Sequence, residues 1–219
     1  MKPRLNLAVI VLLGSLSLVS SAGLIEWKVE NGGNGHFYDV IKVGSGGNGI
    51  TWDAANAAAV AGGGYLATFQ SAAEMDFVSA EVQAVWLNSG EGGPWIGAWR
   101  DPYHDLEDPR EGWHWVTGEP WAYTDWYSPN EPSGTAYDQY GRVVARNSPD
   151  ARYWEDRAQI CRWTTGAKWN DSLGAYAGWV MGYVVEWGAP STVPEPASLC
   201  LLGLACAGIG AALKRRKQA

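Results

Sequence analysis

The pattern of apolar and polar residues predicts two helices near the start of the chain. Residues 52–61 are rich in alanine, the best helix former, and Thr51 before them is a typical N-cap. Residues 71–74 read Ser-Ala-Ala-Glu, a capping-box pattern that begins a second helix. That helix places four apolar side chains near one face: Met75, Phe77, Val78 and Val82.

Short apolar or alternating runs predict strands around these helices, at 37–43, 65–68, 95–99, 113–116 and 179–187. Residues 118–152 hold Pro, Gly, Asn, Asp and Tyr without any period. A long irregular stretch of this kind is usually functional or mobile. The pattern therefore predicts two helices, several short strands and one long loop region.

The N-terminus, residues 1–22, is typical of a signal peptide. Lys2 and Arg4 form a positive start, residues 5–19 are mostly apolar, and 20–22 are small. The alternative is an N-terminal membrane anchor, although the apolar run is short for a span.

The C-terminus, residues 189–219, has the composition of a second targeting segment. A Val-Pro-Glu-Pro sequence precedes an apolar run at 197–213, and Lys-Arg-Arg-Lys follows at 214–217. A helix over that run reaches about 26 Å, enough for a thin transmembrane span. This order resembles the PEP-CTERM sorting signal of bacterial envelope proteins. The resemblance implies export to the cell surface or medium, with an exosortase-type enzyme cleaving near Pro194, Glu195 and Pro196.

Charge and cysteine content narrow the class of the segment between these ends. Of 23 acidic and 16 basic residues, all acidic ones except Glu195 and ten basic ones lie in 23–193, giving a net charge near −12. Such a charge argues against nucleic acid as a partner. Cys161 is the one cysteine of the segment, so no internal disulfide forms there. All fourteen tryptophans lie between Trp27 and Trp187, and they can supply a large core.

The most informative short motif is Trp169-Asn170-Asp171. An amide oxygen beside a carboxylate offers two ligands to a hard cation such as calcium, which takes about six to eight oxygens. Asn-Asp is also ordinary turn chemistry, so the motif gains weight from Glu131-Pro132 and Glu155-Asp156 elsewhere in the chain.

These motifs, in their order, resemble a C-type lectin-like domain over residues 23–188. The resemblance implies a mixed α+β fold with two helices, antiparallel sheets and a long ligand-binding loop. The segments that carry it follow one another along the chain: 51–55, 64–68, 71–74, 95–98, 115–126, 131–132, 155–156, 169–171 and 183–186.

The resemblance implies a calcium site shared between the loop and the strand with the Trp-Asn-Asp motif. The matching ligands are Glu131, Ser133, Glu155, Asn170 and Asp171, with Asp138 as an alternative third carboxylate. It also implies carbohydrate binding at the ion by Glu131, Ser133 and Asn170. Pro132 matches a proline that is typically cis. Trp126 is the candidate for stacking on a sugar, the alternative being a role in the core.

The sequence departs from the family pattern in three ways. Ser133 stands where the family has Asn or Asp, residues 137–153 form an insertion, and the family's disulfide cysteines are absent. Ser133 and the insertion favour the alternative of a metal-independent lectin-like scaffold for protein binding or matrix structure. In that case Glu131-Pro132 is a turn and Asn170-Asp171 a cap.

No pattern indicates an enzyme. His36, His104 and His114 lack zinc-ligand spacing, and neither a nucleophile elbow nor a phosphate loop is present. The sequence therefore predicts an exported, non-catalytic carbohydrate-binding protein, assisted by calcium. The expected partner is a carbohydrate or exopolysaccharide.

Overall fold

Both predicted helices are present in the computed structural model, which describes residues 20–21, 23–44, 48–86, 92–101, 107–161, 167–175 and 179–188. Helix α1 (Trp52–Ala61) follows Thr51, whose hydroxyl accepts a hydrogen bond from the Ala54 N–H at 3.2 Å. Helix α2 (Ala72–Trp86) follows Ser71, whose hydroxyl accepts from the Glu74 N–H at 3.2 Å. The capping box is altered, because the Glu74 carboxylate accepts from the Gln70 N–H rather than from Ser71.

The strands form one sheet with a main path in the order β1-β3-β11-β5-β9-β7-β8. Four more strands join its sides: β2 pairs with β3, β4 with β11, β6 with β5, and β10 with β9. The pairing is antiparallel except between β11 and β5. The bounds are β1 Ser20–Ser21, β2 Ile25–Glu26, β3 Phe37–Lys42, β4 Tyr65–Leu66, β5 Trp95–Arg100, β6 Trp113–Trp115, β7 Ala136–Tyr137, β8 Val143–Val144, β9 Tyr153–Ile160, β10 Trp169–Leu173 and β11 Gly182–Trp187.

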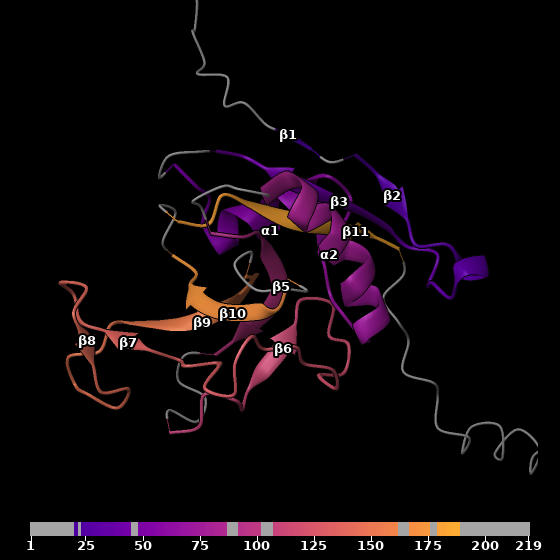
Figure 1. Cartoon of the computed structure of the whole chain (residues 1–219). Coiled ribbons are helices and arrows are strands. Elements are labelled where there is room, and N and C mark those ends of the chain that lie inside the picture. The colour runs from indigo at the N-terminus through magenta and orange to yellow at the C-terminus, as the bar shows by residue number, and fades with distance from the viewer. Residues whose placement is uncertain are drawn as a thin grey trace, which may run out of the picture.

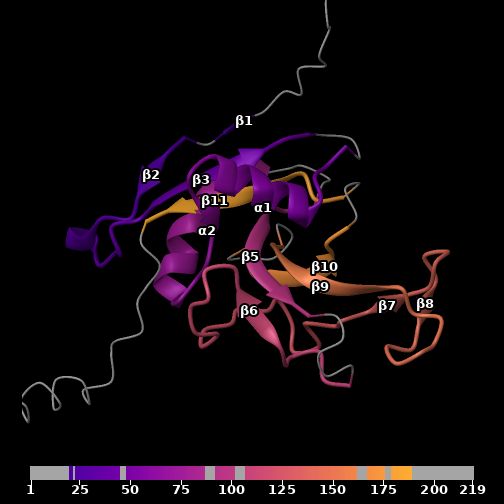
Figure 2. The same ribbon diagram turned by 180° about the vertical axis from the view of Figure 1, so that it is seen from behind.

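The two helices and strands β3 and β11 form one half of the molecule, and β6, β9 and β10 form the other (Figure 1). Strand β5 runs from the first half into the second. The hairpin of β7 and β8 projects away from the body, as the opposite view also shows (Figure 2). This mixed α+β architecture agrees with the fold class expected from the sequence.

Three details differ from the strands predicted by pattern. The segment 118–152, expected to be irregular, contains the short hairpin β7–β8. The closing strand begins at Gly182, later than the predicted residue 179. Strands β1, β2, β9 and β10 also lie outside the ranges that the pattern predicts.

The predicted targeting segments fall mostly outside the described residues. Of the expected signal peptide, Ser20 and Ser21 are described, and they pair with Lys42 and Ile41 of β3. The apolar run 197–213 and the tail 214–217 lie beyond the described part. Over the residues that the structure does describe, none of the helices has the length and apolarity needed to cross a bilayer.

Trp169 lies at the centre of an aromatic core and is 0% exposed. Its ring packs against five others at centroid distances of 5.4–6.0 Å, and its indole N–H donates to the Met75 sulfur at 3.2 Å. The five neighbours are Phe69, Trp115, Trp121, Tyr123 and Trp126. Because these rings come from four separate segments, the core fixes the long loop against β10.

A buried polar network lies within the first half of the molecule and joins strand β11 to its neighbours there. The Glu186 carboxylate contacts the His36 Nδ1 at 2.6 Å and accepts from the Thr68 N–H at 2.9 Å and the Tyr65 hydroxyl at 3.1 Å. The hydrogen bond with Glu186 raises the pKa of His36 above its ordinary value, although burial opposes this. Burial also raises the pKa of Glu74, which accepts from the Tyr38 hydroxyl in the same network.

We expect the contribution of His36 to stability to depend on pH. Its folded pKa exceeds its unfolded value, so the stabilisation is fully present below about pH 6.5 and is lost as pH rises through the folded pKa. The variant His36→Gln should lower the free energy of unfolding by about 1 kcal/mol near pH 5.5, since the hydrogen bond to a charged group is lost. Urea denaturation of both proteins should show this difference shrinking towards about pH 9.

His114→Gln is the matched control, because His114 is exposed and packs on the Trp99 ring instead of a carboxylate. A His36→Gln difference that stays constant or widens with rising pH would contradict this account of the network.

Candidate functional site

Strand β10 presents the Trp-Asn-Asp motif between the core and the long loop. It pairs with β9 so that Asp171 lies opposite Ala158 and Asn170 opposite Gln159. Side chains alternate along a strand, and accordingly Trp169 and Asp171 are both buried while Asn170 is half-buried. The Asp171 side chain is 1% exposed, an unusual position for a carboxylate.

The long loop is tied directly to Asp171. The Asp171 Oδ2 accepts a hydrogen bond of 2.5 Å from the Gly134 N–H of the loop. Shortly before Gly134, the Glu131-Pro132 peptide bond is cis, as the resemblance implied. The Ser133 N–H donates to Glu131 Oε2 at 2.8 Å. These bonds bring Glu131 and Ser133 beside the strand.

Position 134 requires glycine for two reasons. Its φ is +53°, and a Cβ there would lie 1.6 Å from the Arg146 Nη1. That guanidinium donates to the Gly134 carbonyl at 2.9 Å, which links the turn to the inserted segment 137–153. Gly134 and Arg146 were not predicted from the sequence, because no short motif connects residues that lie 12 positions apart.

Strand β9 brings Glu155 to the same turn. Its carboxylate accepts from the Ser133 hydroxyl at 2.9 Å and from the Tyr137 hydroxyl at 3.2 Å. The Ser133 hydroxyl also lies 2.8 Å from the Thr135 hydroxyl. Hydrogen bonds of this turn thus involve Glu131, Ser133, Glu155 and Asp171, and also Tyr137, which was not predicted from the sequence.

The electrostatics of this group favour a cation. Burial raises the pKa of Asp171 well above its usual range, the adjacent Glu131 carboxylate and the charge of Glu155 add to the rise, and the Gly134 N–H opposes it. Within the described residues, no hydrogen-bond donor reaches Asp171 Oδ1. Burial likewise raises the pKa of Glu155. The buried Asp171 carboxylate has an acceptor atom left over and lies near the half-buried carboxylates of Glu131 and Glu155. Such a group matches the oxygen-rich donor set that calcium prefers.

Asn170 and Asp138 occupy different positions relative to this group. Asn170 directly precedes Asp171, and its Nδ2 donates to the Asp171 carbonyl, so the amide oxygen is the atom it can offer a cation. Asp138 caps the β7–β8 turn, where Oδ1 accepts from the N–H groups of Tyr140 and Arg142 at 2.8 and 2.9 Å. These backbone hydrogen bonds hold the pKa of Asp138 below its ordinary value. Glu155 is therefore the better placed third carboxylate.

Glu131 and Trp126 also line a cavity of about 420 Å³ on the loop, together with Trp121, Asp125 and Arg110. The loop is held to β10 here, because the Tyr127 N–H donates to the Trp169 carbonyl at 2.9 Å. Trp126 is half-buried against the aromatic core, so it presents part of its ring to the cavity. Tyr127 is more exposed than Trp126. Burial raises the pKa of Tyr127, and the nearby Glu131 carboxylate raises it further.

The candidate ligands have the chemistry that a hard cation requires, but their side chains are not as closely spaced as a bound ion requires. Every candidate ligand offers oxygen, and the buried Asp171 carboxylate lies beside the half-buried Glu131 carboxylate. Across the described ranges, however, no three His, Cys, Asp or Glu side chains converge tightly enough to hold a metal ion. The Ser133 hydroxyl is already engaged with Glu155 and Thr135.

Comparisons with known proteins bear on the C-terminal sorting segment and on the folded domain. A family model described as the PEP-CTERM protein-sorting motif matches residues 192–217. Comparison with curated protein sequences finds no match. The chain carries a sorting motif that implies secretion with a C-terminal anchor that is removed.

Among solved structures, human lithostathine is similar with a TM-score of 0.50 and 18% identity, covering 75% of this chain and 96% of that one. The C-type lectin CEL-I from Cucumaria echinata has a TM-score of 0.49 and 21% identity, covering 71% and 91%. The C-type carbohydrate-recognition domain of cow CD23 has a TM-score of 0.43 and 20% identity, covering 71% and 90%. The likeness to lithostathine, at a TM-score of 0.50, shows the fold alone, and it agrees with the C-type lectin-like fold expected from the sequence.

The geometry predicts that Asp171 stabilises a bound ion rather than the metal-free fold. In a chelator at neutral pH, Asp171→Asn should raise the free energy of unfolding by about 1 kcal/mol, because its amide removes a like charge and can donate to Glu131. Chemical denaturation measures the difference. Asp138→Asn serves as the control and should give no gain, since Asp138 caps an exposed turn. A marked loss of stability in Asp171→Asn would show instead that the carboxylate holds the fold through Gly134.

Proposed function

We propose that this chain is an exported, non-catalytic carbohydrate-binding protein of the bacterial cell surface or extracellular matrix, and that calcium assists the binding. The observation that carries the proposal is the buried Asp171 carboxylate, with Oδ1 lacking a donor among the described residues and Glu131 beside it. The fold and the sorting motif support binding and export in general terms.

Five side chains would supply oxygens to the ion. They are the carboxylates of Glu131, Glu155 and Asp171, the amide oxygen of Asn170 and the hydroxyl of Ser133. When bound, calcium supplies a Lewis acid that can accept the hydroxyl oxygens of a sugar. Glu131 would accept hydrogen bonds from the same sugar hydroxyls, and the Asn170 amide would donate to them. Ser133 would contribute less to sugar binding because its side chain is short.

The cavity beside Glu131 gives the sugar a place to extend. Its wall includes part of the Trp126 ring, which can pack against the apolar face of a sugar. The adjacent Arg110 and Asp125 supply polar contacts at the rim. The proposed ligand is a carbohydrate, of which an exopolysaccharide of the producing cell fits the sorting motif, and the proposed processing partner is an exosortase-type enzyme.

A metal-independent lectin-like scaffold is the second candidate. The engagement of the Ser133 hydroxyl with Glu155 and Thr135 favours it, because the turn then closes on itself without an ion. The scaffold would bind protein or serve matrix structure, and Asp171 would remain a neutral, protonated buried group.

A calcium titration separates the two candidates. Extracellular calcium sites bind with dissociation constants on the order of 10⁻⁴–10⁻³ M. At calcium about tenfold above that constant, the free energy of unfolding should rise by about 1.4 kcal/mol in the wild type. Asp171→Asn should abolish the rise, and Asp138→Asn should keep it. If millimolar calcium neither shifts the melting temperature of the wild type nor gives a heat of binding, the result would favour the scaffold.

Glycan binding at this site should depend on both calcium and Asn170. On an oligosaccharide array in calcium, we expect signals that fall at least tenfold in Asn170→Ala or on adding a chelator, because the ion loses a ligand or is removed. Circular dichroism should show an unchanged fold in the variant. Binding at full strength in the chelator would exclude a calcium-assisted site for those glycans.

A further inference from the structure

A cavity of about 560 Å³ lies away from the proposed calcium site and between four elements. Asp53 of α1, strand β9, the end of β10 and the tip of the β7–β8 hairpin line it. Among the described residues, it shares no lining residue with the cavity beside Glu131. Nothing in the proposed function uses this space.

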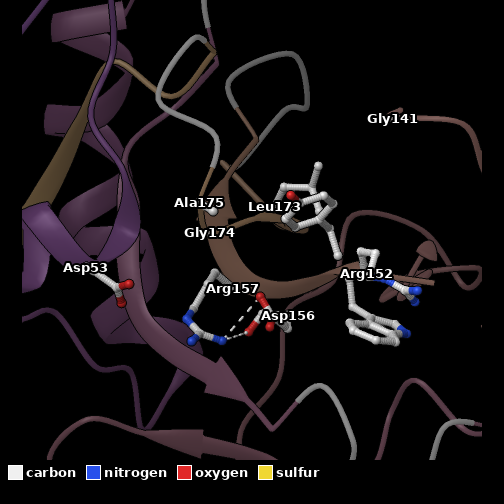
Figure 3. A pocket seen from close by; sticks show the side chains of 10 residues that line it. Asp53, Gly141, Arg152, Asp156, Arg157, Leu173, Gly174 and Ala175 are labelled. Carbon is white, nitrogen blue, oxygen red and sulfur yellow. Dashed lines mark hydrogen bonds and ion pairs between the residues drawn. The ribbon is translucent and has the colours of Figure 1, made fainter. Parts of the chain in front are cut away.

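A β-bulge in β9 directs two charged side chains into this cavity. Ser172 pairs with Arg157 and Leu173 with Glu155, so Asp156 is an extra residue between them. A bulge interrupts the alternation of a strand and re-aims its side chains. Glu155 therefore contacts Ser133 at the calcium site, while Asp156 and Arg157 lie together in the other cavity (Figure 3).

The polar pair is held in a fixed position. The Arg157 guanidinium lies 4.8 Å from the centroid of the Trp52 ring, and its Nη1 donates to the Arg100 carbonyl at 3.2 Å. Its ion pair with Asp156 Oδ1 is 3.2 Å long. Gly174 makes room for it, because a Cβ there would lie 2.4 Å from the Arg157 Cγ. Groups fixed before binding lose little entropy on meeting a ligand.

Apolar and aromatic surface completes the cavity. Tyr153, which is 48% exposed, and Leu173 line it, and Trp154 anchors the inserted hairpin through a small core with Ala136 and Ala151. The inserted segment thus builds one wall of the cavity. Figure 3 shows Asp53 on one side of the Asp156–Arg157 pair and Arg152 on the other.

The balance of charge favours a neutral ligand. Two carboxylates, Asp53 and Asp156, and two guanidiniums, Arg152 and Arg157, line the cavity, so the formal charges cancel. The lining therefore carries no excess of one charge that would favour an anion or a cation. A neutral molecule with adjacent hydroxyls can both donate to a carboxylate and accept from a guanidinium, while its C–H face packs on an aromatic ring.

We infer that this cavity is a second carbohydrate site, which binds a neutral sugar without a metal ion. Asp53, Asp156 and Arg157 bind the hydroxyls, and Tyr153 packs against the ring. With the site beside Glu131, it would give one domain two separate contacts with a polysaccharide. The inference does not rest on calcium binding.

The test uses the full-length protein on an array of neutral and acidic oligosaccharides, with chelator present throughout. At least one neutral oligosaccharide should bind, and both Tyr153→Ala and Asp53→Asn should reduce that signal at least tenfold. Tyr140→Ala is the matched control, because Tyr140 is a 72% exposed tyrosine of the same inserted segment 137–153 but outside the cavity lining. It should bind like the wild type, and so should Asp171→Asn.

Three results would overturn the inference: no neutral oligosaccharide bound in chelator, only acidic ones bound, or neutral binding unchanged in both cavity variants. Thermal melting checks that each variant is folded, and both substituted positions are exposed. The array is run in chelator, so its result does not depend on whether the protein binds calcium. Failure of the second carbohydrate site can therefore be distinguished from failure of the proposed calcium site.

Discussion

The burial of the Asp171 carboxylate is the constraint around which the long loop is arranged. A carboxylate removed from water needs hydrogen-bond donors, a counter-charge or a proton. One oxygen has the Gly134 N–H, and among the described residues the other has no donor. Because Glu131 adds a like charge beside it, the arrangement is costly without a cation and is explained if a cation binds there.

The aromatic core places this carboxylate. Trp169 is fixed by five rings, and Asp171, two residues further along β10, faces the same interior. The loop cannot move independently, since Trp121, Tyr123 and Trp126 belong both to it and to the core. Rigid packing on one side and an unmet electrostatic need on the other are typical of a binding site.

Local chemistry made much of the fold predictable from the sequence. Thr51 and Ser71 cap the two helices as their side chains indicated. The apolar and alternating runs located strands β3, β4, β5, β6 and β11. The residues proposed as ligands, apart from Asp138, meet or adjoin one another. Asp138 follows local turn chemistry instead, since the N–H groups of Tyr140 and Arg142 lie within reach of its carboxylate.

Features that depend on distant residues were not predictable in this way. The bulge at Asp156 arises from the pairing of β9 with β10, which no period in β9 reveals. The contact of Arg146 with Gly134 and that of His36 with Glu186 join residues far apart in the sequence. The engagement of the Ser133 hydroxyl, which weakens the ligand set, likewise became visible only with Glu155 in place.

Terbium luminescence tests the central claim most directly, because Tb³⁺ replaces calcium at oxygen sites and tryptophan beside the ion sensitises its emission. Trp126 and Trp169 flank the proposed ligands, so no label is needed. The account predicts tryptophan-sensitised emission from the wild type that calcium competes away and that Asp171→Asn abolishes. Emission absent from the wild type, or unchanged in Asp171→Asn, would contradict it.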